Sequence, residues 1–331
     1  MRKIKSAIEN PKCQYVSFDV FDTLIVRPFF NPTDLFLLLN DYVLSLLNTI
    51  DVPAFDQLRK DAEICARAER RAAHSCDEDI SLKEIYNYVI DQLDISPDTA
   101  AAIMQKEIEL ELRYCYARKT GKQLFEYAKS QGKSIILVSD MYLSQEIIKR
   151  ILSKNGYSGY QRLFVSNECH CTKRTGSLFD FVKKEMQQKS AASFIHVGDN
   201  IQSDYIMPKK KGWRAFLLPK TLALFQNRIP FRYSGGSFFK IYITDAALPS
   251  ANEALNYLGI RCMLAVVANE IFDNPDIKIK GRSDFNADPG FFGYYVLGMY
   301  IFAMAKWLIE ANEAAHYDSI NFFSRDGILP K

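Results

Sequence analysis

Several acidic and hydroxyl side chains stand directly after short apolar runs in this sequence. Val16 and Phe18 belong to the first run, Asp19 follows it, and Asp22 and Thr23 come shortly after. Such a run is typical of a buried strand, and ligands bind at the carboxyl ends of the strands of an open α/β sheet. We therefore expect Asp19 at a functional edge.

Three later positions repeat this arrangement. Ser139 follows the apolar run 134–138, Lys173 precedes Gly176 and a predicted helix, and Asp199 follows the run 193–197 and Gly198. Asp204 comes five residues after Asp199. Either of these two aspartates could instead serve as a turn or helix-cap residue, which is common for Asp after Gly.

Carboxylates, a hydroxyl and an ammonium group at one edge are the groups that phosphoryl transfer uses. That reaction needs an in-line nucleophile and positive charge around the transferring oxygens. Clustered carboxylates also favour a hard cation with oxygen ligands. The adjacent Cys169, His170 and Cys171 are interpreted as loop residues rather than a zinc site, since no second cluster completes a tetrahedron.

Composition limits the class of protein. The chain has 331 residues, of which 48% are apolar, so it can bury a large core and is expected to form two or three domains. With 42 basic and 39 acidic residues, no strong field favours nucleic acid or a membrane surface as a partner. Seven cysteines and no recognisable signal peptide predict reduced thiols and a cytoplasmic location.

The elements that must position these side chains follow from periodicity. Residues 32–47, 56–71, 82–93 and 97–118 have helical patterns, so about ninety residues of helix separate the first strand from the second. Beyond them the chain alternates strand and helix, which predicts a parallel sheet. The expected strands are 134–138, 163–165, 193–197 and 213–217.

The four strand-end segments, in this order, resemble the motifs of the haloacid dehalogenase-like (HAD) hydrolase superfamily over residues 13 to 218. The segment from Ser139 to Tyr142 is most similar to predicted hydrolases attached to bacterial glycosyltransferases and cell-surface polysaccharide clusters. The resemblance implies an α/β fold, a Rossmann-like parallel sheet with an inserted helical cap and a helical C-terminal appendage. The core would be 1–27 and 119–218, the cap 28–118, and the C-terminal region 219–331.

The resemblance also implies roles. Asp19 would attack phosphorus and become an aspartyl phosphate, while Ser139 and Lys173 would hold the phosphoryl oxygens. Magnesium would be held by Asp19, Asp199, Asp204 and the backbone carbonyl of Phe21. The substrate would be a small phosphomonoester, such as a sugar or nucleotide phosphate, because a cap excludes polymers.

One position departs from the pattern of the phosphatases. They carry a second aspartate two residues after the nucleophile, which protonates the leaving group and later activates water, and this chain has Phe21 there. Asp22 stands one residue further on and would share the catalytic face only if the chain turns. Two alternatives therefore stay open: a weak or inactive module for binding or polysaccharide assembly, and a dehalogenase-like hydrolase that uses Asp19 without a metal.

The region after 218 has a different pattern. Residues 251–272 and 291–311 are predicted helices, and 291–305 contains no charge. Because a membrane span needs about twenty apolar residues, we expect a buried helix there. The segment 319–327 is predicted to be a strand with an acidic end, similar to the start of a second, truncated HAD-like domain. The C-terminal region is a candidate contact for a glycosyltransferase or a second copy of the chain.

Overall fold

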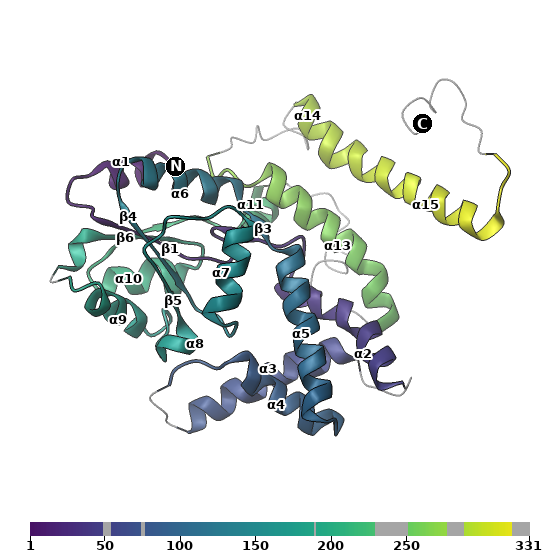
Figure 1. Ribbon diagram of the computed structural model, residues 1–331. Coiled ribbons are helices and arrows are strands. Elements are labelled where there is room, and N and C mark those ends of the chain that lie inside the picture. Colours follow the sequence, from purple (N-terminus) through teal and green to yellow (C-terminus); the bar gives the residue numbers. More distant parts are fainter. Residues whose placement is uncertain (49–53, 74–76, 189, 229–250, 277–287, 320–331) are drawn as a thin grey trace. The chain divides into compact units, whose positions relative to one another are not determined.

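The computed structural model describes residues 1–48, 54–73, 77–188, 190–228, 251–276 and 288–319 (Figure 1). Its centre is a five-stranded sheet in the order β5-β4-β1-β6-β7, in which every pairing is parallel. This confirms the predicted α/β class. The strands are β1 Tyr15–Phe18, β4 Ser134–Ser139, β5 Arg162–Val165, β6 Phe194–Gly198 and β7 Arg214–Leu217.

Strand β1 lies in the middle of the sheet, which explains its uninterrupted burial. Val16 pairs with Ile135 on one side and Ile195 on the other. A parallel strand in this position is covered on both faces, so its sequence reads as a continuous rather than an alternating apolar run. Asp19 is therefore placed at the centre of the carboxyl edge.

Helices cover both faces of the sheet. Along β4, Ile136 and Val138 join an apolar cluster with Phe179, whereas Ile135 and Leu137 join the larger main core. The alternation follows from the period of two along a strand. The helices around the sheet are α1 Arg2–Glu9, α6 Lys119–Ser130, α7 Gln145–Lys154, α8 Ser166–Cys169, α9 Ser177–Glu185 and α10 Met207–Lys210.

A helical insertion separates β1 from β4 (Figure 1). It begins after β2 Ile25–Val26 and ends at β3 Tyr116–Ala117, and these two short strands pair antiparallel at its base. The sequence analysis missed this ladder, because two-residue strands have no periodicity. The insertion contains η1 Pro32–Leu39, α2 Asn40–Leu47, α3 Phe55–Ala72, α4 Leu82–Leu93 and α5 Pro97–Tyr114.

Local sequence signals set the bounds of these helices. Ser81 and Glu84 form a capping box at the start of α4, and Ser96 caps α5 with Pro97 in its first turn. The single helix expected over 32–47 is instead a 3₁₀ segment, η1, followed by α2. A buried ion pair, Arg59 to Glu107 at 2.7 Å, joins α3 to α5.

The region expected over 219–331 is divided between two compact units. Helices α11 Thr221–Arg228 and α13 Ala251–Ile271 belong almost entirely to the unit that holds the sheet. Buried ion pairs explain this, because Arg261 binds Asp34 at 2.6 Å and Arg118 binds Asp273 at 2.7 Å.

The second unit contains α14 Pro289–Phe292, η5 Gly293–Gly298 and α15 Met299–Ala315, so the predicted helix 291–311 lies within it. The expected burial of this helix is not observed, because no residue of α15 is buried and Tyr300, Phe302, Trp307 and Ile309 are exposed. The packing partner of these apolar side chains stays a prediction. The strand predicted in 319–327 falls almost entirely outside the described residues. In the described segments, no helix is both long and apolar enough to cross a membrane.

Gly121 allows α6 to start against the turn that follows Asp19. A Cβ at this position would lie 2.1 Å from the backbone oxygen of Thr23. Gly121→Ala should therefore lower the free energy of unfolding by about 1–3 kcal/mol or more, as overpacked sites do. Urea unfolding would measure this. Gly259→Ala is the control, because that exposed helical position is open and alanine should stabilise it by up to about 1 kcal/mol. Equal stabilities of the two variants would contradict the steric account.

Candidate active site

Lys173 lies between two of the predicted catalytic carboxylates. Its Nζ is 2.5 Å from Asp19 Oδ1 and 2.7 Å from Asp204 Oδ1. Asp19, Asp199 and Asp204 each offer one carboxylate oxygen, and these three oxygens lie within 4.8 Å of one another. The structure thus brings Asp19, Lys173, Asp199 and Asp204 together at the carboxyl edge of the sheet.

The position of Asp204 depends on a glycine and on buried hydrogen bonds. A Cβ on Gly198 would be 2.4 Å from Asp204 Cγ, so only glycine leaves room for this carboxylate. The backbone N–H of Asn200 donates to Asp204 Oδ2 at 2.9 Å, and Asn200 caps the π-helical turn η3 Ile201–Ile206 that carries Asp204. Asp204 is therefore 1% exposed and held from several directions.

Two buried residues behind Asp204 were missed in the sequence. His196 Nε2 lies 3.1 Å from Asp204 Oδ1, and His196 Nδ1 lies 2.8 Å from Ser17 Oγ. Ser17 and His196 are direct neighbours in the register of β1 and β6. A histidine inside an otherwise apolar strand was the available signal, because a buried polar side chain needs a hydrogen-bond partner.

The loop that carries Lys173 is fixed by Asp140. The Asp140 carboxylate accepts the backbone N–H of Lys173 at 2.8 Å and that of Arg174 at 3.3 Å. Asp140 is the residue after Ser139, so the ends of two sequence motifs are joined directly. The sequence analysis quoted Asp140 within its motif but gave this carboxylate no role.

Ser139 ends β4 with a buried hydroxyl. It is 1% exposed, and its Oγ has no hydrogen-bond partner in the described part of the chain. A buried hydroxyl without a partner is unfavourable, and such groups are rare in folded proteins. An oxygen of a bound ligand would satisfy it.

Asp22 and Asp199 share a lysine that the sequence analysis did not select. Asp22 has a φ of 59°, so the chain turns there, and its carboxylate lies 2.6 Å from Lys220 Nζ. Lys220 also lies 3.4 Å from Asp199, which accepts a 3.3 Å hydrogen bond from Thr23 Oγ1. Asp22 thus belongs to the side of the site that holds Asp199. Lys220 stands just before α11 and carried no sequence signal.

Phe21 has an arginine over its ring. The guanidinium of Arg27 lies 4.5 Å from the ring centroid and makes two hydrogen bonds to Glu111, at 2.8 and 2.9 Å. The position where phosphatases of the resembled superfamily carry an acid is therefore occupied by an aromatic ring under a paired cation. The carbonyl of Phe21 stays a predicted metal ligand.

Burial and nearby charges together shift the pKa values of these groups. Burial raises the pKa of Asp19 despite the nearby Lys173 ammonium, and burial together with Asp19 and Asp22 raises that of Asp199. For Asp204, burial is outweighed by Lys173 and His196, so its pKa falls. For Lys173, burial is outweighed by Asp19, Asp204 and Asp140, which raise its pKa.

The residues fit a hard divalent cation. Three carboxylates offer oxygen ligands around one point, and burial makes the negative charge on two of them unfavourable without further positive charge. Magnesium and calcium prefer oxygen ligands of this kind. The magnesium site predicted from the sequence is thus compatible with the donor set.

No family model matches the chain, and no curated protein matches it. Among solved structures, it is similar to a 2-haloacid dehalogenase from Pseudomonas syringae pv. tomato DC3000 (14% identity, TM-score 0.48, 62% of this chain and 86% of that one). It is also similar to YfnB from Bacillus subtilis, described as a HAD-hydrolase and bound to magnesium (16%, 0.42, 61% and 86%). A predicted phosphoglycolate phosphatase from Haemophilus somnus 129PT is a further match (13%, 0.40, 61% and 83%). At similarities this low, the case for any chemistry rests on the side chains of this chain.

The pKa of Asp140 predicts a pH dependence of stability. Burial raises this pKa from its ordinary value near 4 to about 6, although Lys173 lowers it. Because the pKa of Asp140 is higher in the folded than in the unfolded state, the protonated side chain contributes to the free energy of unfolding. This contribution is complete below about pH 4 and is lost as pH rises through about 6. The melting temperature of the wild type should therefore fall relative to that of Asp140→Asn over this interval. A constant difference between the two proteins across the interval would contradict the assignment.

Proposed function

We propose that the chain is a magnesium-dependent phosphohydrolase or phosphotransferase that acts on a small phosphomonoester through an aspartyl phosphate on Asp19. The observation that carries this proposal is the Lys173 ammonium bound to Asp19 within a cluster of three carboxylates. The group combines a nucleophile, a fixed positive charge and oxygen ligands for a cation, which together suit phosphoryl transfer.

The residues would act as follows. An Asp19 carboxylate oxygen attacks phosphorus, the bond between phosphorus and the leaving oxygen breaks, and that oxygen departs with the electron pair. Lys173 and the Ser139 hydroxyl hold the phosphoryl oxygens, which would give Ser139 Oγ the partner that it lacks. Water or a second acceptor then takes the phosphoryl group and restores the carboxylate.

Asp19, Asp199, Asp204 and the carbonyl of Phe21 would hold the magnesium ion. Bound there, the ion would offset the repulsion between the anionic nucleophile and the anionic substrate. Thr23 and Lys220 orient Asp199, and Asn200 and His196 orient Asp204. These contacts would keep the ligands in place between cycles.

A second candidate function is a module that binds a ligand without turnover. Phe21 under Arg27 favours it, because no acid stands where the leaving group would receive a proton. Dehalogenase-like hydrolysis also tolerates an aromatic residue there. It needs no metal, however, and the cluster of Asp19, Asp199 and Asp204 argues for one. A role beside glycosyltransferases in polysaccharide synthesis, contacts through 219–331 and a cytoplasmic location stay predictions from the sequence.

Magnesium should raise the melting temperature of the wild type. A ligand that binds only the folded state stabilises it by about 2.7 kcal/mol at one hundred times its dissociation constant. Asp199→Ala should lose this shift, whereas Asp98→Ala, which removes an exposed carboxylate on α5, should keep it. Equal shifts in the wild type and Asp199→Ala would remove the metal site from the account.

Without an acid at position 21, turnover should depend steeply on the leaving group. Aryl and acyl phosphates should react, alkyl phosphates should react barely, and Asp19→Asn should abolish both activities. General acid–base assistance is worth about 10²- to 10⁴-fold, which sets the expected penalty for poor leaving groups. A phosphatase panel with and without magnesium measures this. The binding-module candidate would be favoured if no ester were turned over and Asp19→Asn left ligand binding unchanged.

Phe21→Asp and Asp22→Asn identify any acid that replaces the missing one. A carboxylate at position 21 would face Arg27, which lowers the pKa of a carboxyl group and weakens it as a proton donor. Phe21→Asp should therefore recover only part of the activity on alkyl phosphates. If Asp22 already donates the proton, Asp22→Asn will silence the wild type and Phe21→Asp will add little.

A further inference from the structure

A cleft of about 600 Å³ lies between the helical insertion and the loops of the candidate active site. One side is formed by the end of α3, with Arg67, Arg70 and Arg71, and by the segment Asp77 to Ile80 that follows. The other side is formed by Asp140 and by Thr172, Arg174 and Thr175 of the Lys173 loop. Small-molecule sites are typically about 300–1,000 Å³.

The cleft adjoins the position proposed for the phosphoryl group. Asp140 follows Ser139 directly, and Thr172 and Arg174 flank Lys173 on both sides. Consecutive residues are only about 3.8 Å apart along the chain. Ser139 and Lys173 are themselves buried and do not line the cleft, so a phosphomonoester held by them would reach it past these neighbouring residues.

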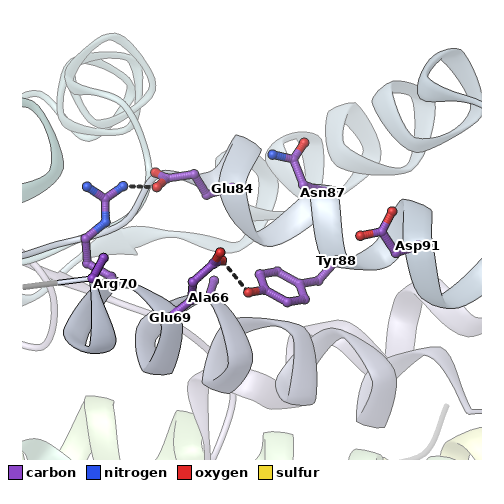
Figure 2. A pocket seen from close by; sticks show the side chains of 8 residues that line it. Ala66, Glu69, Arg70, Glu84, Asn87, Tyr88 and Asp91 are labelled. Carbon is purple, nitrogen blue, oxygen red and sulfur yellow. Dashed lines mark hydrogen bonds and ion pairs between the residues drawn. The ribbon is translucent and has the colours of Figure 1, made fainter. Parts of the chain in front are cut away.

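Two of the four arginines that line the cleft are already paired. Arg67 binds Asp79 at 2.6 Å, and Arg70 binds Asp77 at 2.8 Å. Figure 2 shows Arg70 directed toward Glu84 across the groove between α3 and α4, where the two residues form a second ion pair. These cations are held by the insertion itself.

The acidic residues of the cleft are also engaged. Glu78 accepts the backbone N–H and hydroxyl of Thr172, both at 2.9 Å, and the hydroxyl of Thr175 at 2.5 Å. Asp140 accepts the backbone N–H groups of Lys173 and Arg174. Glu78 thus joins the insertion to the Lys173 loop and holds the two walls of the cleft in place relative to each other.

Arg71 and Arg174 are the two other arginines that line the cleft. Both line the cleft and are exposed, and neither guanidinium makes a hydrogen bond or ion pair with the described residues. They come from opposite walls, one from α3 and one from the Lys173 loop. Guanidinium groups match carboxylate and phosphate oxygens with paired hydrogen bonds.

We propose that this cleft holds the leaving group of the substrate and that Arg71 and Arg174 bind a second anionic group on it, a carboxylate or a phosphate. This inference rests on the proposed function only for the position of the first phosphate. It assigns the substrate class as a small phosphomonoester with a further acidic group, and it makes Arg71 and Arg174 the residues that select it.

Calorimetry on the full chain tests the proposal without requiring turnover. In the Asp19→Asn background with magnesium, we compare 3-carboxyphenyl phosphate with its neutral isostere 3-carbamoylphenyl phosphate. Benzene-1,3-diyl bisphosphate tests a phosphate as the second anion. Because hydrogen bonds to charged groups contribute about 1.5–3 kcal/mol, the preferred anion should bind about tenfold or more tightly than the isostere.

Arg71→Ala and Arg174→Ala should each remove most of this preference, and the double variant should remove all of it. Binding of the carbamoyl compound should stay unchanged. Arg150→Ala removes an exposed arginine on α7 that has no ion pair with the part of the chain that the structure describes, and it should keep the full preference. Melting temperatures verify that every variant is folded. A preference below about twofold for both anions, or one that survives in the double variant, overturns the proposal. Failure of the wild type to turn over any ester would refute the proposed reaction and leave this binding result standing.

Discussion

The buried ammonium group of Lys173 is the interaction on which the site depends. Asp19 and Asp204 are both almost fully buried, and two carboxylates in that position repel each other and lose their hydration. Lys173 contacts both at hydrogen-bond distance, and Asp140 fixes its backbone from the next strand end. Among the described residues, removal of this one cation would leave Asp19 without its ion pair and Asp204 with the contacts to His196 and Asn200 alone.

The same constraint explains the surrounding residues. Gly198 leaves room for Asp204, and His196 and Ser17 extend its hydrogen bonds into the sheet. Glu78 joins the insertion to the Lys173 loop, so the position of the insertion is coupled to the position of Lys173. A movement of the insertion would therefore shift the loop that carries Lys173.

Much of the fold could be predicted from the sequence because four of the five strands of the main sheet, β1, β4, β5 and β6, are short, mostly buried and followed by a polar residue. A run such as Ile135 to Val138 predicts a strand from local sequence alone. In a parallel sheet, the residues that follow each such strand then lie together at the carboxyl edge. The positions of Asp19, Ser139 and Lys173 could therefore be anticipated together. Their roles rest on a resemblance and on the experiments above.

Other parts could not be predicted because they depend on tertiary contacts. Lys220 reaches Asp22 from a segment 198 residues later in the chain and also lies beside Asp199, with no local signal. The cation over Phe21 comes from Arg27, whose orientation is set by Glu111 on α5. The placement of α13 likewise depends on Arg261 and Asp34, which no periodicity reveals.

Detection of the phosphorylated enzyme tests the central claim most directly. The missing acid at position 21 would also have activated water, so an aspartyl phosphate formed from an acyl phosphate should break down slowly and accumulate. Acid-quenched samples taken over time with magnesium, then analysed by peptide mass spectrometry, should show one added phosphoryl group on the peptide that carries Asp19. The added mass should be absent in Asp19→Asn. Turnover of the acyl phosphate with no such peptide at any time, or with the added group retained in Asp19→Asn, would contradict the account.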